Sequence, residues 1–497
     1  MGIEITQSSF NQDSYDLFRV KLHRNLDALA KLLENQHFGK AEKGSCGLGA
    51  ELELYIIDEK CQPLCVNQEI LSSAKDPQLT LELNRYNLEY NLSPYPLEKQ
   101  PFTALEDEII TQLIKLNNVA EQYHGRVIPI GILPTLDPSH FGPHFLTDKL
   151  RYKALVEQLV KRRGSDFHID IDGDQPLQID MEDGTLEGAN TSFQIHYRVD
   201  PAEYASMFNA FQLITPLLVA IGGNSPGLFG HDLWSETRIP LFKQSIDSRI
   251  KDRYQWHEPA RVNFGHGWIR HSALEIFREV VNIYSPLLPI CSDEDPLDQC
   301  MRGEIPSLAE LRLHQSSVWL WNRPVYDDAD GGHLRVELRA LPAGPTAVDM
   351  VSNAAFYIGL AESYRDEMPK LMSALPFGLA EFNFYRAAQS GLDANVVWPN
   401  SNQSGCQQQG IIDVLRQSVD RAMSGLLSIG IEKSEAEKYL SVIQARIDTT
   451  QTGASWQSKR IEHYRALHSN KESQRLMLED YIAYSMSNIP VSEWSRI

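Results

Sequence analysis

The sequence is short of positive charge and of long apolar runs, and both shortages narrow the classes of protein it can belong to. Across 497 residues the formal net charge is −20. This disfavours nucleic acid and anionic lipid as partners, because both require a positive surface. No run of about 18 apolar residues is apparent, so no membrane span is expected. The polar, acidic N-terminal segment lacks the features of an export or transit signal, which favours a cytoplasmic location.

Cysteine is also scarce, and its positions do not form a pattern. In a long chain without an export signal, scattered cysteines are expected to remain reduced thiols. The C-x-x-x-C pair lacks the second pair of ligands that a structural zinc site needs. A G-x-x-x-x-G-K-[ST] motif is missing too, so a P-loop is not the means of holding nucleotide. The six cysteines are Cys46, Cys61, Cys65, Cys291, Cys300 and Cys406.

What is present is a mixture of helical and strand-like patterns. Hydrophobic residues make up 42% of the chain, enough for a sizeable core. Leucines at helical spacing predict an amphipathic helix over 15–35, and a similar pattern covers 103–123. A hairpin with its turn at Asp183-Gly184 is expected within 166–188. From residue 346 onward helices dominate. This order predicts an α+β catalytic core with helices packed around it.

The most informative stretch is Gly49 to Ile56, which has the pattern of a buried strand. Residues two apart in a strand point the same way, so Glu51 and Glu53 share one face and apolar side chains share the other. Two neighbouring carboxylates repel each other unless a positive group lies between them. The stretch is therefore either an amphipathic strand with a solvated face or part of a metal or phosphate site.

Three further segments alternate in the same way, and none of the four contains lysine, which is common on solvated faces. If the strands form one sheet with an apolar and a polar face, several acids crowd together and raise one another's pKa. Divalent cations would relieve this, and oxygen ligands with one imidazole suit Mg²⁺ or Mn²⁺ better than Zn²⁺. The polar faces carry Asn87, Glu89 and Asn91; Ser192, Gln194, His196 and Arg198; and His333, Arg335, Glu337 and Arg339.

Eight motifs follow one another along the chain. They are Gly49-x-Glu51-x-Glu53, Asn87 to Pro94 with Glu82 seven residues before Glu89, Gln194-Ile195-His196, Asn224-Ser225-Pro226, Ser235 to Arg238, Glu337-x-Arg339, Asn383 to Ala394 and Thr452-Gly453-Ala454. In this order they resemble the motifs of the glutamate–cysteine ligase superfamily. That superfamily has a glutamine-synthetase-like fold, which implies a largely antiparallel sheet flanked by helices. The resemblance implies a catalytic core over residues 1–400 and a helical C-terminal region, 401–497, packed on it.

The resemblance also implies roles for individual residues. Arg339 would contact the transferring phosphoryl group, and Arg238 is a candidate anchor for substrate or phosphate. Gln194, Asn224, Arg198 and Arg335 would bind substrate or nucleotide. The implied metal ligands are Glu51, Glu53, Glu82, Glu89, His196 and Glu337.

The implied activity is an ATP-dependent, Mg²⁺- or Mn²⁺-dependent joining of an amino-acid carboxylate to an amine through an acyl phosphate, as in glutathione biosynthesis. A cluster of cations and an arginine is the usual means of stabilising the charge of such a transfer. Two alternatives remain at this point: a phosphotransferase of related fold, and a non-catalytic metal- or nucleotide-binding protein. The residues leave open which amine is used, whether glutamate is the donor, and the oligomeric state.

Overall fold

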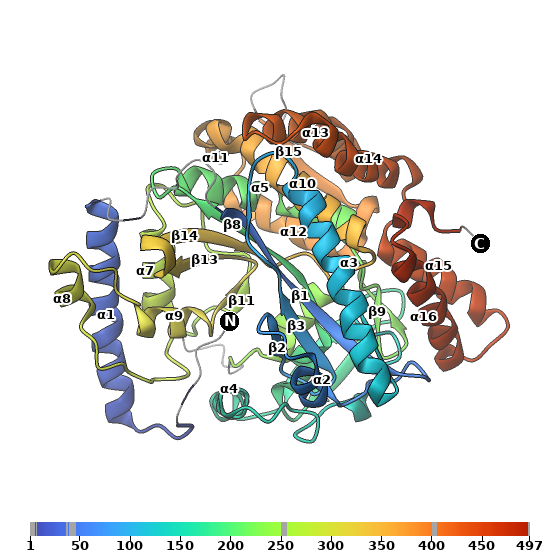
Figure 1. The fold of residues 1–497 in the computed structure, drawn as a ribbon, viewed down its shortest axis with the longest axis horizontal. Helices are drawn as coiled ribbons and strands as arrows, with labels where there is room; N and C mark the ends of the chain where they lie inside the picture. The colour runs from blue at the N-terminus through green and yellow to red at the C-terminus, as the bar shows by residue number, and fades with distance from the viewer. Residues whose placement is uncertain are drawn as a thin grey trace.

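The computed structural model describes residues 5, 7–35, 38, 46–249, 256–399 and 405–495. An eight-stranded sheet occupies the centre of the molecule (Figure 1), and every strand pair that it contains within these residues is antiparallel. Its main path runs β13-β14-β8-β1-β3-β2, while β4 and β5 also pair with β1. The strands are β1 (Cys46–Asp58), β2 (Leu79–Leu81), β3 (Asn87–Asn91), β4 (Tyr95–Pro96), β5 (Gly125–Ile128), β8 (Phe193–Val199), β13 (Asn322–Asp327) and β14 (His333–Leu338).

The register of this sheet places the polar side chains of four strands on one face. Because side chains alternate along a strand, directly paired residues point to the same side. Leu52 and Leu54 on β1 point to the other side and are buried in the core. The pairs on the polar face are Glu53 with Glu89, Glu51 with Gln194, and Glu337 with His196.

Helices cover the sheet and form most of the C-terminal third. Figure 1 shows α13 and α14 lying across the top of the molecule, where they pack on α10. α15 and α16 pack on each other at the right of the same view. The long helices that cover the sheet or form the C-terminal third are α3 (Pro101–Ala120), α5 (Tyr204–Gly222), α10 (Ala347–Tyr364), α12 (Phe377–Ser390), α13 (Ile411–Ser428), α14 (Lys433–Thr449), α15 (Gly453–Arg465) and α16 (Asn470–Ser487).

α5 is long and apolar enough to cross a membrane, which the sequence reading overlooked. Within the fold, however, 89% of this segment is buried, with α10 and α12 packed against it. Burial on all sides explains why this helix is apolar around its whole circumference.

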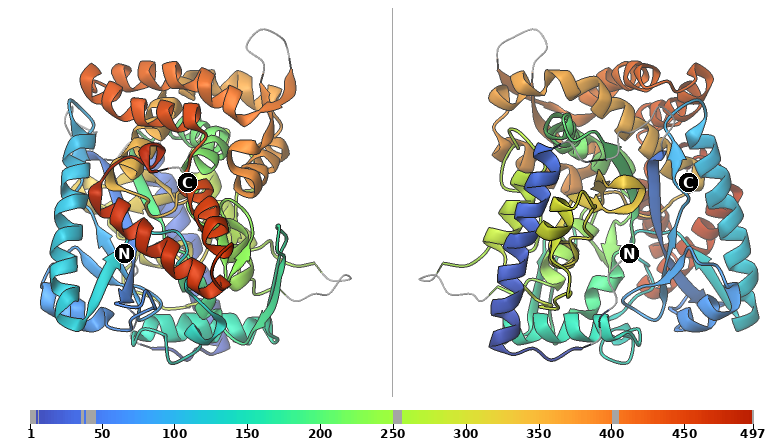
Figure 2. Two further views of the ribbon diagram at one scale, coloured as in Figure 1. Left: turned by 90° about the vertical axis from the view of Figure 1, so that its right-hand side faces the viewer. Right: turned by 60° about the vertical axis from the view of Figure 1, so that its left-hand side comes forward.

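A layer of helices beside the sheet combines the N-terminal segment with residues 274–315, which lie far from it in the sequence. The N-terminal helix α1 (Gln12–Glu34) packs against α7 (Leu274–Ile283), α8 (Pro296–Met301) and α9 (Ala309–Gln315). Figure 1 and the right panel of Figure 2 show these helices side by side. The chain then leads from α9 through β12 (Trp319–Leu320) directly into β13 of the sheet. This layer therefore forms one border of the polar face.

The remaining elements are short or lie at the edges. They are α2 (Asn67–Ala74), α4 (Leu150–Arg163), α6 (Arg238–Ser245), α11 (Met368–Ala374), β6 (Phe167–Ile171), β7 (Leu177–Met181), β9 (Gly227–Leu228), β10 (His231–Asp232), β11 (Val262–Asn263), β15 (Asn395–Pro399), β16 (Cys406–Gly410) and the 3-10 turn η3 (Gly184–Ala189). Cys61, Cys65, Cys291, Cys300 and Cys406 are free thiols.

The predicted α+β class, with its antiparallel sheet and helical C-terminal region, is confirmed. The predicted hairpin turn at Asp183-Gly184 is wrong. β6 and β7 pair around residues 172–176, and Asp183 instead begins η3 by accepting a hydrogen bond from the Thr185 amide at 2.8 Å. The division into two domains at residue 400 stays a prediction, and that residue lies outside the described residues, between the paired strands β15 and β16.

Candidate active site

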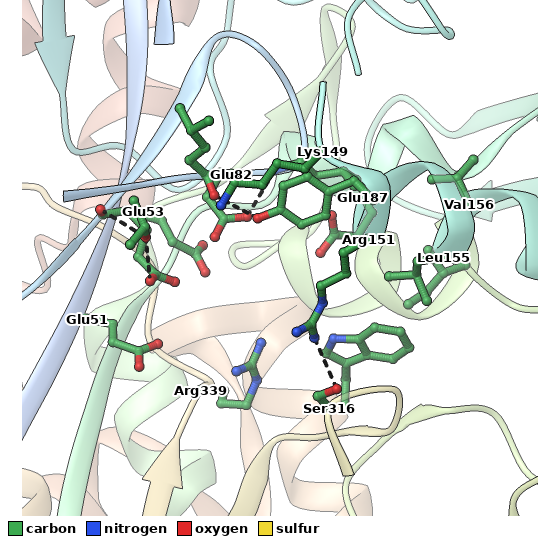
Figure 3. A pocket seen from close by; sticks show the side chains of 18 of the residues that line it. Glu51, Glu53, Glu82, Lys149, Arg151, Leu155, Val156, Glu187, Ser316 and Arg339 are labelled. Carbon is green, nitrogen blue, oxygen red and sulfur yellow. Dashed lines mark hydrogen bonds between the residues drawn. The ribbon is translucent and has the colours of Figure 1, made fainter. Parts of the chain in front are cut away.

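A cavity of about 350 Å³ lies over the polar face of the sheet (Figure 3). Strands β1, β3 and β8 contribute acids and an amide to it, and Arg339 follows directly after β14. Further lining residues come from β2, β12, β13, α4, η3 and the loops next to them. The ionisable and amide side chains that line it are Glu51, Glu53, Glu82, Glu89, Glu187, Gln194, Lys149, Arg151, Arg323 and Arg339. The sheet face predicted from alternation is therefore the floor of a pocket.

Three of the predicted metal ligands form a tight cluster. One possible ligand atom from each of Glu51, His196 and Glu337 lies within 4.8 Å of the other two. Glu337 accepts hydrogen bonds from Arg323 Nε at 2.9 Å and Nη2 at 2.6 Å, and it also pairs with Arg339. We refer to these five residues as the paired group.

The arginines control the charge of the paired group. Burial opposes ionisation of Glu337, but the guanidiniums of Arg323 and Arg339 outweigh it and lower the pKa of this carboxyl to about 2. Burial likewise opposes ionisation of Glu51, whose pKa is held well below its ordinary value by His196. Both carboxylates are thus charged at neutral pH, and positive neighbours balance them.

Arg335 fixes the orientation of His196. Its Nε donates a hydrogen bond to His196 Nδ1 at 2.9 Å, and its Nη1 donates to Asp327 at 2.8 Å. Since Nδ1 accepts, a neutral His196 carries its proton on Nε2, which lies 3.2 Å from Glu51 Oε1. Coordination of a cation through Nε2 would displace that proton and require Arg335 to release Nδ1.

The remaining acids of the pocket form what we call the crowded group: Glu53, Glu82, Glu89 and Glu187. Among the described residues, none of these carboxyls forms an ion pair. Glu53 accepts hydrogen bonds from the Ser192 amide and from Gln194 Nε2, both at 2.7 Å, and Glu89 accepts from Asn91 Nδ2 at 2.9 Å. No hydrogen bond reaches the Glu187 carboxyl from the described part of the chain.

The crowded group is therefore electrostatically unfavourable when fully ionised. Burial, followed by Glu51, raises the pKa of Glu89 to about 7, and burial, followed by Glu53, raises that of Glu187 to about 8. Burial and the Glu89 carboxylate raise the pKa of Glu82 well above its ordinary value. Burial also raises the pKa of Glu53, although Arg339 acts against it.

Both groups fit divalent cations, for different reasons. His196 Nε2 is buried and makes no hydrogen bond of good geometry, which suits an imidazole ligand beside Glu51 and Glu337. The crowded group supplies hard carboxylate oxygens that form no ion pair within the described part of the chain, which suits Mg²⁺ or Mn²⁺. Zinc is disfavoured because no described thiolate lines the pocket.

Arg339 lies where the two groups meet. It pairs with Glu337, and its Nη1 donates to Gln194 Oε1 at 2.5 Å. Gln194 in turn donates to Glu53, so one chain of contacts links the paired and the crowded groups. A guanidinium in this position can contact an anionic group bound between them.

Two residues predicted to act in binding or catalysis do not line the pocket. Asn224 is fully buried, and its Nδ2 donates to Ala343 O and to Tyr481 Oη, both at 2.8 Å. Arg238 is buried in an ion pair with Glu236 at 2.9 Å, and its Nη2 donates to the carbonyl of Arg339 at 3.5 Å. Their roles toward substrate or nucleotide stay predictions.

Arg335 and Arg198, also predicted to bind substrate or nucleotide, share the polar face but do not line the main pocket. Arg335 borders a smaller cavity of about 80 Å³ that also contacts Glu51 and Arg323. Arg198 pairs in register with Arg335 across β8 and β14 and lines neither cavity. Sequence reasoning missed Glu187, Arg323, Lys149 and Arg151, which line the pocket from outside the four alternating strands.

The polar face of an antiparallel sheet thus gathers acids, one histidine and arginines at a pocket, and this set of charges fits a site for cations and anions together. The sequence adds the family. Residues 47–478 match the model of glutamate–cysteine ligase family 2 (GCS2), and because the match covers most of the chain, the protein belongs to that family. This membership supports a carboxylate–amine ligase. Comparison with curated protein sequences finds no significant match.

Several solved structures are distantly similar. A glutamate–cysteine ligase from Francisella tularensis in complex with AMP is 11% identical, with a TM-score of 0.49 over 89% of this chain and 90% of that one. A bifunctional glutathione synthetase from Pasteurella multocida is 12% identical, with a TM-score of 0.48 over 93% of this chain and 55% of that one. The complex of the prokaryotic ubiquitin-like protein Pup with its ligase PafA gives 10% identity, with a TM-score of 0.40 over 90% of this chain and 74% of that one.

Proposed function

We propose that this protein is an ATP- and Mg²⁺-dependent ligase that joins an amino-acid carboxylate to an amine through an acyl phosphate. The observation that carries the proposal is the convergence, on the two sides of Arg339, of a charge-balanced Glu51–His196–Glu337 cluster and of four acids that form no ion pair with the described residues. A pocket with so many carboxylates can bind ATP and a second carboxylate only when cations neutralise it.

The reaction has two steps. An oxygen of the donor carboxylate attacks the γ-phosphorus of ATP, the bond to ADP breaks, and an acyl phosphate forms. The amine nitrogen then attacks the acyl carbon, the bond to phosphate breaks, and a proton leaves the nitrogen as the amide forms. With glutamate as the donor, which family membership supports, the product is a γ-glutamyl amide. Manganese is a possible substitute for Mg²⁺, and we place the reaction in the cytoplasm.

The chain's own residues hold the reactants apart from water and in line. Glu51, His196 and Glu337 would hold one divalent cation, and Glu53, Glu82 and Glu89 would hold others; bound there, the ions would neutralise charge on the phosphates. Arg339 is placed to contact the transferring phosphoryl group. Gln194 keeps Arg339 and Glu53 in fixed positions through its two hydrogen bonds.

The acyl phosphate is the feature to test. Purified protein with ATP, MgCl₂, glutamate and hydroxylamine should form a hydroxamate and an equal amount of ADP. Omitting Mg²⁺ should abolish both. Arg339→Lys should lower kcat by about 10²–10³-fold, because a point charge replaces a planar donor aimed at the phosphoryl group. Arg126→Lys, an exposed arginine on β5 of the same sheet, is the matched control and should retain full activity.

Other outcomes would contradict the proposal. ATP-dependent phosphorylation of an acceptor without hydroxamate, for any carboxylate offered, would indicate a phosphotransferase. Full activity of Glu53→Gln would remove this residue from the cation-binding set. No ATP turnover under any of these conditions would point to a binding protein.

A further inference from the structure

One wall of the main pocket is apolar, and most of it comes from α4. Residues three and four apart on a helix share a face, so the spacing of four pocket-lining residues on α4 places them on the same side. Figure 3 shows Leu155 and Val156 on the side of the pocket away from Glu51. The wall consists of Tyr152, Leu155, Val156 and Leu159 from α4, with Ile246 and Trp319.

Glu187 stands where this wall meets the crowded group. The other three members of that group belong to the polar face of the sheet or to its edge at β2–β3. Glu187 instead lies on η3, which packs against α4 and α6. In the view of Figure 3, its side chain lies between Glu82 and Leu155. Because the described residues offer it neither a hydrogen bond nor an ion pair, it has full capacity to accept from a ligand.

The charge of the surroundings indicates what that ligand is. A carboxyl at the border of an apolar wall complements a positive nitrogen that carries an apolar body. A nucleotide needs positive groups near its phosphates, and the main pocket offers Lys149 and Arg151 at the start of α4 and Arg323 and Arg339 at the sheet. The part of the wall next to Glu187 differs, because a carboxylate there repels a phosphate and attracts a positive nitrogen. This part of the wall therefore suits the reactant that contributes the nitrogen.

We propose that Glu187 and the apolar wall of α4 select the amine acceptor: a primary amine whose nitrogen lies at Glu187 and whose apolar body packs against Leu155, Val156 and Trp319. This inference rests on the proposed ligase function and adds the class of the second substrate. Glu187 acts in recognition, and Glu53, Glu82 and Glu89 remain the residues proposed to hold cations.

The test compares amines of similar size and different polarity. Amide formation is measured with leucine and with asparagine, in the presence of ATP, Mg²⁺ and glutamate. The kcat/KM for leucine should exceed that for asparagine by about ten-fold or more. Val156→Thr, which keeps the shape of the side chain and adds a hydroxyl, should reduce this ratio.

A charge-neutralising variant tests Glu187 itself. Glu187→Gln should raise KM for leucine about ten-fold, while KM for ATP and the ADP formed in a single turnover without amine stay unchanged. Glu157→Gln makes the same chemical change on the exposed side of α4 and should alter none of these values. A merely structural role of Glu187 would change all of them together.

The outcomes separate this inference from the function on which it rests. If no acyl phosphate is trapped with any carboxylate, the ligase function is wrong and the inference falls with it. If acyl phosphate forms but asparagine is used as well as leucine, the inference alone is wrong. It is equally wrong if Glu187→Gln or Val156→Thr raises KM for ATP and leaves KM for the amine unchanged.

Discussion

The paired group and the crowded group hold similar acids on neighbouring strands, yet their electrostatics are opposite. In the paired group, Arg323 and Arg339 pair with Glu337, and His196 lies against Glu51; both carboxyls stay ionised. In the crowded group, four carboxyls share the pocket with no ion-pair partner among the described residues, and burial raises their pKa values.

The difference teaches what each group requires from a ligand. The paired group does not need a cation for its charge balance, because the guanidiniums of Arg323 and Arg339 already lie against the Glu337 carboxylate. The crowded group is strained at neutral pH and gains the most from a cation. The same substitution, glutamate to glutamine, should therefore have opposite effects on the metal-free protein in the two groups.

The largest effect is expected in the paired group. Glu337→Gln leaves the guanidiniums of Arg323 and Arg339 without their buried carboxylate, and breaking such a pair lowers the free energy of unfolding by about 3 kcal/mol. Urea unfolding in EDTA at pH 7.5 measures this. Glu304→Gln, which breaks the exposed pair with Arg302, should leave the urea unfolding midpoint nearly unchanged. Equal effects of the two variants would contradict the assignment.

The crowded group should respond in the other direction. Glu82→Gln removes one of several repelling acids, and burial and Glu89 already raise the pKa of Glu82, so the variant should raise the urea unfolding midpoint of the metal-free protein at pH 7.5. The same variant should lose ligase activity, since a cation ligand is gone. Destabilisation in EDTA would show that Glu82 has a positive partner, and the contrast between the groups would fail.

Much of the paired and crowded groups was predictable, because strand alternation is visible in a sequence. Period-two spacing puts Glu51 and Glu53 on one face, and the observed register brings Glu89, His196 and Glu337 onto it. What alternation cannot give is which strands are neighbours, and that step relied on resemblance to a family.

The roles of polar loop residues are hard to predict for a physical reason: a polar residue in a loop has the same sequence pattern whether its partner is a ligand or the protein. Asn224 and Arg238 follow loop motifs, but their partners, Tyr481 and Glu236, are protein groups. Glu187 was missed because it lies in a 3-10 turn with no period of its own. Arg323 was missed for a similar reason, since Pro324 interrupts the pattern of its strand.

The two groups should also differ in how stability depends on pH. Glu187 and Glu89 have ordinary pKa values near 4.5 when the chain is unfolded and about 8 and 7 when it is folded. Between these values the folded state binds more protons, so the stability that these groups contribute is full below pH 4.5 and is lost as the pH rises toward 8.

The urea concentration at the unfolding midpoint, measured in EDTA, should therefore fall as the pH is raised from 5.5 to 7.5. Glu187→Gln should reduce the fall by roughly 1 kcal/mol per pH unit, whereas Glu157→Gln, with its exposed side chain, should leave it unchanged. Added Mg²⁺ should flatten the wild-type profile, because the cation takes the place of the protons. A profile that rises with pH would mean that the carboxyls of the crowded group are balanced by positive charge, as those of the paired group are.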